Sequence, residues 1–259
     1  MSNGTGAHAG APAIELTDVT RSFGGLTTLA GVSLSLRHRA RTGIVGPSGC
    51  GKTTLLQVIA GLLEADSGVV RVGDATTARQ RLARCALMPQ RDLLLPWRTA
   101  LDNAVIAVEN RGLSRAAARQ HTRPLFEQLG LAGFERARPG QLSGGMRQRV
   151  SFLRTLMAEK DVLLLDEPFG ALDSITRGQL QEWLSQAMEA VPRTVLLVTH
   201  DVDEALLLCQ QVVVLSARPG RVVQVLPGGG GFRGSRREIV TSPEFVSLKE
   251  QALEALGHE

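Results

Sequence analysis

The stretch that decides the fold reads Gly46-Pro47-Ser48-Gly49-Cys50-Gly51-Lys52-Thr53-Thr54 and fits the pattern G-x-x-x-x-G-K-[ST]. An apolar run precedes it at residues 43–45 and an apolar helical segment follows at residues 55–60, which is the strand–loop–helix setting the pattern requires. Glycines let successive backbone N–H groups point at phosphate oxygens, and the helix N-terminus adds partial positive charge. We therefore predict a nucleoside triphosphate site, with Lys52 on the terminal phosphates and Thr53 as a ligand of Mg²⁺.

Around this loop, apolar runs bounded by turn residues alternate with helical patterns. The runs expected to be strands cover residues 14–19, 32–36, 43–45, 69–72, 86–88, 162–165, 195–198 and 212–215. Two of them, 162–165 and 195–198, are apolar without alternation, which is typical of parallel strands covered on both faces. Strands that alternate with helices predict an α/β core.

The helical patterns divide the chain further. Met146, Val150, Leu153 and Met157 share one helix face, and further helices are expected at residues 176–190 and after Asp201. A stretch rich in Ala, Arg and Gln near residues 96–139 lacks any convincing strand. We therefore predict a helical subdomain, about residues 96–158, inserted into the α/β core.

The ends of the chain have a different composition. Residues 1–13 are rich in Gly and Ala and are expected to be a flexible N-terminus, so that the main domain covers residues 14–226. Residues 227–259 are expected to form a glycine-rich connection, flexible at the glycine run 228–231, and a C-terminal helix.

Composition excludes several function classes. The chain has 259 residues, 43% apolar and 21% charged, which is ordinary for a soluble globular protein. Its net charge of +4 comes from scattered arginines, which fits a solvated surface or a weak attraction to an anionic membrane. Low aromatic content argues against nucleic-acid binding by base stacking. The three cysteines form no CxxC pair and are expected to be reduced thiols, and no apolar window is long enough to span a membrane.

Two carboxylates, Asp166 and Glu167, follow the apolar run at residues 162–165. At a strand end beside the phosphate loop, Asp166 is placed to hold the Mg²⁺ shell and Glu167 to act as general base on the attacking water. A solvated turn is the alternative for the pair taken alone. A second anion site is expected at Ser143-Gly144-Gly145, where a capping serine and two glycines precede the helix that begins near Met146. An ordinary capped helix start is the alternative there.

In this order, these motifs resemble the ATP-binding-cassette (ABC) family, whose signature is LSGGQ, with Met146 in place of the glutamine. The resemblance covers residues 14–220. It implies a RecA-like core, an N-terminal antiparallel β subdomain and an inserted α-helical subdomain. The roles it implies are stacking on adenine for Phe23, sensing of Mg²⁺ and water for Gln90, contact with the partner for Asp173 and contact with the γ-phosphate for His200. Taken singly, the phenylalanine could be core, the glutamine a surface residue and the histidine an ordinary polar residue.

The resemblance also implies partners. Two copies of the chain pair head to tail, so that the phosphate loop of one faces Ser143-Gly144-Gly145 of the other across ATP. The pair sits on the cytoplasmic face of the membrane as a peripheral subunit, bound to a membrane permease that works with a solute-binding protein.

Competing functions are weighed on particular features. DNA-repair ATPases of this family carry a long coiled coil, for which the 90 residues between Lys52 and Ser143 leave no room. Translation factors carry two cassettes, and a small-molecule kinase has no use for residues 142–148. We expect an importer subunit, with a free-standing exporter ATPase as the alternative. Residues 88–103 are similar to the nitrate, sulfonate and taurine branch, which includes transporters of pyrimidine thiamin precursors. Trp97 fits either the groove that receives the permease or the core of the helical subdomain.

Overall fold

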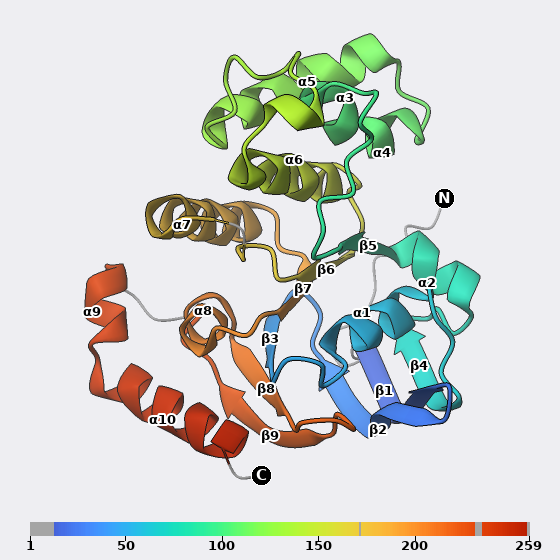
Figure 1. The fold of residues 1–259 in the computed structure, drawn as a ribbon, viewed down its shortest axis with the longest axis vertical. Helices are drawn as coiled ribbons and strands as arrows, with labels where there is room; N and C mark the ends of the chain where they lie inside the picture. The colour runs from blue at the N-terminus through green and yellow to red at the C-terminus, as the bar shows by residue number, and fades with distance from the viewer. Residues whose placement is uncertain (1–12, 171, 231–234, 258–259) are drawn as a thin grey trace, which may run out of the picture.

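The computed structural model describes residues 13–170, 172–230 and 235–257, and its larger sheet forms the centre of the molecule (Figure 1). The strands of this sheet lie in the order β5-β6-β7-β3-β8-β9. Their bounds are β3 (Arg41–Val45), β5 (Cys85–Met88), β6 (Val162–Asp166), β7 (Thr194–Val198), β8 (Gln211–Leu215) and β9 (Val222–Pro227). All pairs are parallel except β8 with β9. Every residue of β3, β6 and β7 is buried, as the unbroken apolar runs predicted for β6 and β7.

The smaller sheet is antiparallel, with the strand order β2-β1-β4. It consists of β1 (Ile14–Phe23), β2 (Leu26–Leu36) and β4 (Ser67–Val72). Gly24 and Gly25, both with positive φ, connect β1 to β2 in a two-residue hairpin, a turn that glycine adopts without steric cost. The inner face of this sheet packs against α1 (Lys52–Ala60), so the antiparallel β subdomain lies directly beside the phosphate loop.

The predicted helical subdomain is present, and no strand lies within residues 96–158, all of which the structure describes. Its helices are α3 (Ala100–Ala104), α4 (Ile106–Glu109), α5 (Arg115–Gln128) and α6 (Gly144–Leu156), with a 3₁₀ turn at Pro139–Gln141. The α/β core adds α2 (Ala78–Arg84), α7 (Ser174–Ala190) and α8 (Val202–Leu208). Figure 1 shows the helical subdomain at one end of the molecule, joined to the sheet through α6.

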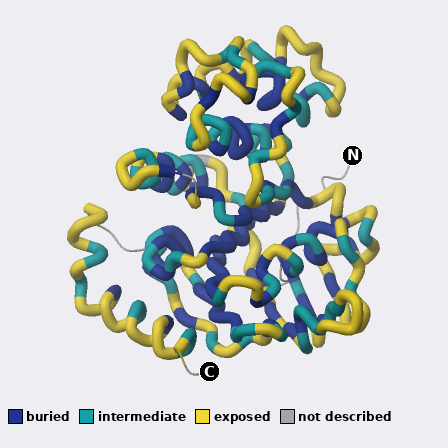
Figure 2. The backbone as a smooth tube through the Cα atoms, in the orientation of Figure 1, coloured by how far each residue is buried: buried dark blue, intermediate teal, exposed yellow. Residues whose placement is uncertain are grey.

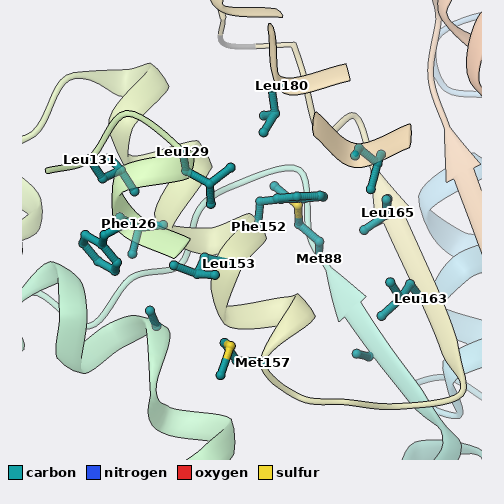
Figure 3. Close-up of a cluster of buried hydrophobic side chains, with 14 of the residues drawn as sticks. Met88, Phe126, Leu129, Leu131, Phe152, Leu153, Met157, Leu163, Leu165 and Leu180 are labelled. Carbon is teal, nitrogen blue, oxygen red and sulfur yellow. The ribbon is translucent and has the colours of Figure 1, made fainter. Parts of the chain in front are cut away.

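A continuous hydrophobic cluster joins the two parts (Figure 3). Met88 and Leu165 enter it from the sheet, Phe152 and Leu153 from α6, and Phe126 from α5. The dark band of buried residues in Figure 2 runs through the sheet and continues into α6. Because α6 is packed on both sides, its N-terminus is held at a fixed place relative to the sheet.

The C-terminal segment departs from the sequence prediction. The expected flexible connection is wrong for Gly228 to Gly230, whose N–H groups donate to the carbonyls of Gln210, Leu206 and Cys209. A Cβ at Gly228 would lie 2.2 Å from the Cys209 oxygen, so these glycines serve close packing. The expectations for residues 1–12 and Gly231 lie outside the described residues.

Two elements of this segment were missed, β9 and α9 (Arg236–Val240), whereas the C-terminal helix α10 (Pro243–Gly257) was expected. The helix α9 has no buried residue and carries no apolar pattern, whereas β9, an edge strand with exposed valines, carries the β-branched run VVQVL, a strand signal that was overlooked. Phe245 and Ala252 of α10 are buried against α8 and the edge of the sheet, which docks the tail on the core.

Candidate active site

The site lies where the carboxyl ends of three adjacent parallel strands meet. In the register of the sheet, Val198 of β7 is opposite Ile44 of β3 on one side and Asp166 of β6 on the other. The phosphate loop after β3, the acidic pair after β6 and His200 after β7 therefore come together at one edge. This edge is where open α/β sheets bind their ligands.

The phosphate loop, residues 46–51, ends at Gly51, the N-cap of α1, with a φ of 104°. A Cβ at Gly51 would lie 2.8 Å from Leu29 Cδ2 and 3.0 Å from the Thr28 carbonyl oxygen, so only glycine fits. The buried Lys52 folds back over the loop, and its Nζ donates to the carbonyls of Gly46 at 2.7 Å and Pro47 at 2.9 Å. The loop is thus a cradle of backbone groups with one ammonium inside it.

The adjacent Thr53 and Asp166 form an oxygen pair that fits a magnesium ion. The Thr53 hydroxyl donates to Asp166 Oδ2 at 2.7 Å, and this carboxylate is buried. Burial raises the pKa of Asp166, while the Thr53 hydrogen bond acts in the opposite direction. The Thr53 hydroxyl and the buried Asp166 carboxylate are the hard oxygen donors that Mg²⁺ prefers, and a bound cation would offset the cost of burying the carboxylate.

Glu167 and His200 contact each other directly. Glu167 Oε2 lies 2.7 Å from His200 Nδ1, and the carboxylate side chain is 12% exposed whereas the imidazole is 67% exposed. Glu167 has a φ of 49°, in the left-handed region that non-glycine residues rarely occupy, and its N–H donates to the Val198 carbonyl at 2.9 Å. The backbone strain aims this carboxylate at the strand ends, and such strain is common at functional sites.

Glu167, the Thr53–Asp166 pair and the phosphate loop border a cavity of about 340 Å³ at the edge of the sheet, and His200 does not line it. It is lined by Thr28, Ser48, Gly49, Gly51, Lys52, Thr53, Thr54, Gln90, Asp166 and Glu167. All but Thr28 were predicted as site residues from the sequence. Gly46, Pro47 and Cys50 complete the loop without lining the cavity, and burial raises the pKa of the Cys50 thiol.

The remaining predicted residues lie outside this cavity. Ser143 caps α6 by accepting from the Met146 N–H, while it and Gly144 remain exposed and Gly145 is half-buried. Asp173 caps α7, and the Thr176 backbone N–H lowers the pKa of its exposed carboxylate. Ala171, in the same loop, lies outside the described residues.

Phe23 ends β1 at the surface, also outside the cavity. Its ring is 44% exposed, and the Arg21 guanidinium lies 4.7 Å from the ring centroid. A ring held in this way at the surface presents an aromatic face beside the antiparallel subdomain, and it is not part of the core.

Comparison with known proteins agrees with this arrangement. A model of the ABC transporter family matches residues 29–170. Over 249 residues the chain is 37% identical to an ATP-binding protein of Brucella abortus, covering 96% of this chain and 95% of that protein. The chain belongs to the ABC transporter family. It is 43% identical over 229 residues to the taurine import ATP-binding protein TauB of Chromobacterium violaceum, covering 87% of each.

The ABC fold is also matched by a solved structure. The dimeric, post-hydrolysis ATP-binding cassette MJ0796 bound to ADP and phosphate superposes with a TM-score of 0.75 at 28% identity, covering 86% of this chain and all of that one. The chain is therefore the ATP-binding and ATP-hydrolysing cassette of an ABC transporter, with the RecA-like core, the antiparallel β subdomain and the inserted helical subdomain that its motifs predicted.

Two features of this ABC cassette were missed from the sequence. Gln148, buried in α6, donates from its amide to the Glu167 carbonyl at 3.4 Å and so connects the signature helix to the acidic pair. Its place two residues after Met146 could have drawn attention to it. Thr28 lines the cavity from β2, and nothing in its local sequence marks it.

The surface of the helical subdomain settles one alternative. Trp97 is 70% exposed and is not a core anchor.

Across the residues that the structure describes, no helix has the length and apolar character needed to cross a bilayer.

Proposed function

We propose that this chain is the ATP-hydrolysing subunit of an ABC importer for taurine or a related small sulfonate. The observation that carries the catalytic part is the cavity in which Lys52, from the end of β3, meets Asp166 and Glu167, from the end of β6. The names of relatives such as TauB support import, and none of the comparisons favours the exporter alternative. We further propose residues 14–226 as the ATPase domain, with the helical subdomain at about 96–158.

Within one chain, the proposed roles follow from the contacts. Lys52 exchanges its two carbonyl partners for phosphate oxygens, while the glycine-rich backbone donates around it. Thr53, Asp166 and Gln90 hold magnesium, which supplies positive charge beside the phosphates when bound. Glu167 accepts the proton of the attacking water on its carboxylate.

His200 is proposed to steady that carboxylate and to contact the γ-phosphate. An ionised carboxylate can only accept, so the 2.7 Å contact places a proton on Nδ1 when Glu167 is charged. The other ring nitrogen is then free to face the nucleotide. Phe23, exposed at the end of β1, is proposed to stack on the adenine ring.

The second half of the site is proposed to come from another copy of the chain. Ser143, Gly144, Gly145 and Asp173 line no part of the phosphate cavity, yet the first three offer a capped helix N-terminus at the surface. MJ0796 forms a dimer, which supports a head-to-tail pair with ATP in the interface. Hydrolysis then weakens the pair, and its opening is the mechanical output.

We also propose a membrane permease as the direct partner, a solute-binding protein as the indirect one and a peripheral position on the cytoplasmic face of the membrane. The exposed Trp97 of the helical subdomain and Leu93, just before it in the chain, offer apolar contacts for the permease.

The transport proposal is tested in proteoliposomes that contain this chain, the permease encoded beside its gene and the corresponding binding protein. We expect ATP-driven uptake of labelled taurine, with none when Glu167→Gln replaces the native chain. Uptake of nitrate or a pyrimidine in place of taurine would contradict the proposed solute. ATP-driven accumulation of taurine inside inverted vesicles, whose cytoplasmic face is outside, would show export and would contradict the importer.

A further inference from the structure

The C-terminal segment is anchored to α8 at several points. Phe245 and Ala252 of α10 are buried in a cluster with residues of α8 and β9, and Lys249 pairs with Asp203 at 2.8 Å. Figure 1 shows α9 and α10 running along the outer side of α8. The tail is thus held in place by contacts that do not involve its first helical residue, Arg236.

Arg236 reaches across to α7 instead. Its guanidinium donates to Gln181 Oε1, and Gly178, one turn earlier on α7, has no side chain to fill this space. The Gln181 amide, itself buried, donates onward from Nε2 to Glu204 Oε1 of α8 at 2.9 Å. Three elements are therefore connected by two consecutive hydrogen bonds.

The orientation of Gln181 is fixed from both ends. Its carbonyl oxygen faces a cation and its amino group faces a carboxylate, so the flipped amide would place donor against donor and acceptor against acceptor. Removal of the guanidinium leaves the amide free to rotate or to seek another donor. The Glu204 carboxylate, which is buried, depends on this amide for one of its few hydrogen bonds.

Glu204 continues the path to the active site. Its carboxylate also accepts a hydrogen bond from the Thr199 hydroxyl, and the Thr199 Oγ1 accepts from the Asp201 N–H at 3.1 Å. Asp201 in turn accepts from the Glu204 N–H at 3.1 Å as the N-cap of α8. Thr199 and Asp201 flank His200, so this closed set of bonds fixes the backbone on both sides of the imidazole.

We propose that Arg236 is a positioning residue: through Gln181 and Glu204 it holds the loop that carries His200 against Glu167. The expected effect on hydrolysis rests on the role proposed for His200, whereas the hydrogen-bonded path from Arg236 to Glu204 does not depend on that role. The C-terminal tail thereby becomes part of the active-site framework, so that whatever displaces α9 also loosens the catalytic histidine.

The first test is the full-length chain with Arg236→Ala, compared with Arg237→Ala, the neighbouring exposed arginine of the same helix. We expect kcat for ATP hydrolysis to fall roughly 2- to 30-fold in the first variant, the range for residues that act through others, with KM for ATP unchanged. Arg236→Lys keeps a cationic donor and should recover most of the rate. In a Gln181→Met background, Arg236→Ala should have no further effect. If Gln181→Met and Arg236→Ala lower kcat independently, so that their effects multiply, the proposed path would be overturned.

The second test reads the position of His200 without catalysis. The imidazole resonances of the nucleotide-free protein are followed by NMR, with His200 assigned through His200→Gln among the five histidines of the chain. Arg236→Ala should shift the His200 signal, and Arg237→Ala should not. No shift, or equal shifts in both variants, would overturn the proposal. A shift with unchanged kcat would uphold the positioning and contradict the catalytic role proposed for His200.

Discussion

Two helix N-termini in this molecule are proposed to bind the same triphosphate, and their surroundings differ. At α1, Lys52 and Asp166 are buried and find their partners within the chain. At α6, Ser143 and Gly144 are exposed, and the serine oxygen is used by the helix itself. The first terminus is a complete cradle with catalytic groups around it, whereas the second is a surface. The difference fits the proposed mechanism, in which one chain carries out the chemistry and the pairing of two chains controls it.

The largest effect is expected near the N-terminus of α1, where the proposed catalytic groups lie. Glu167→Gln keeps the volume of the side chain and its contact with His200 but cannot accept a proton, so hydrolysis should fall by about 10²- to 10⁴-fold. ATP affinity should remain near wild type, since Lys52 and the phosphate loop are untouched. Single-turnover hydrolysis and equilibrium nucleotide binding measure the two quantities. Turnover within a factor of three of wild type would remove Glu167 as the general base.

The second prediction concerns the N-terminus of α6. Ser143→Arg places a long cation where the two copies should meet, and ATP-dependent dimerisation should be lost while the affinity of the monomer for ATP stays the same. Ser114→Arg is the matched control, because Ser114 is likewise an exposed N-cap serine, on α5. Light scattering with ATP, in the Glu167→Gln background, reads the dimer. Dimerisation by the Ser143 variant would contradict the shared site.

Sequence alone could predict most of the fold because its signals are local. The unbroken apolar runs of β6 and β7 and the helical spacing around Val150 are written within a few residues. The helix α9 could not be found in this way, since none of its residues is buried, whereas β9 carries a local apolar run that was overlooked. The glycines 228–230 were misread because their close approach to Cys209 depends on tertiary packing.

The residues of the site likewise fall into those that a local sequence pattern marks and those that it does not. The phosphate loop, the acidic pair and His200 carry patterns that a sequence displays, and the parallel sheet brings them to one edge. Thr28 and the path from Arg236 to Glu204 join residues far apart in the chain, and no local pattern announces them. The role proposed for Asp173 depends on a second copy of the chain.

A smaller effect is expected at Phe23, which is proposed to stack on the adenine ring. Phe23→Ala removes an exposed ring that Arg21 holds in place, and the loss of one stacking contact should raise the ATP dissociation constant roughly 5- to 10-fold. Leu26→Ala removes a comparably exposed apolar side chain from the paired position on β2 and serves as the control. Fluorescent ATP titration distinguishes them, and equal losses in both variants would point to the hairpin, with no stacking by the ring.

The smallest effects concern pH, and they should have opposite signs at Glu204, a buried carboxylate of α8, and at Asp173, the exposed carboxylate that caps α7. Burial raises the pKa of Glu204, so folding loses stability as pH rises from the ordinary glutamate range through the folded pKa. Glu204→Gln should therefore melt at a higher temperature than wild type at neutral pH, and this gain should vanish on acidification.

The Thr176 N–H lowers the pKa of Asp173. The ionised carboxylate therefore adds stability above the ordinary aspartate range, and this stability is lost as pH falls through the folded pKa. Asp173→Asn keeps the cap without the charge and should melt slightly lower at neutral pH, with the deficit vanishing in acid. Thermal melts from pH 3 to 8 in EDTA measure both differences, and the same sign for the two variants would show that the buried and exposed sides do not differ electrostatically in this way.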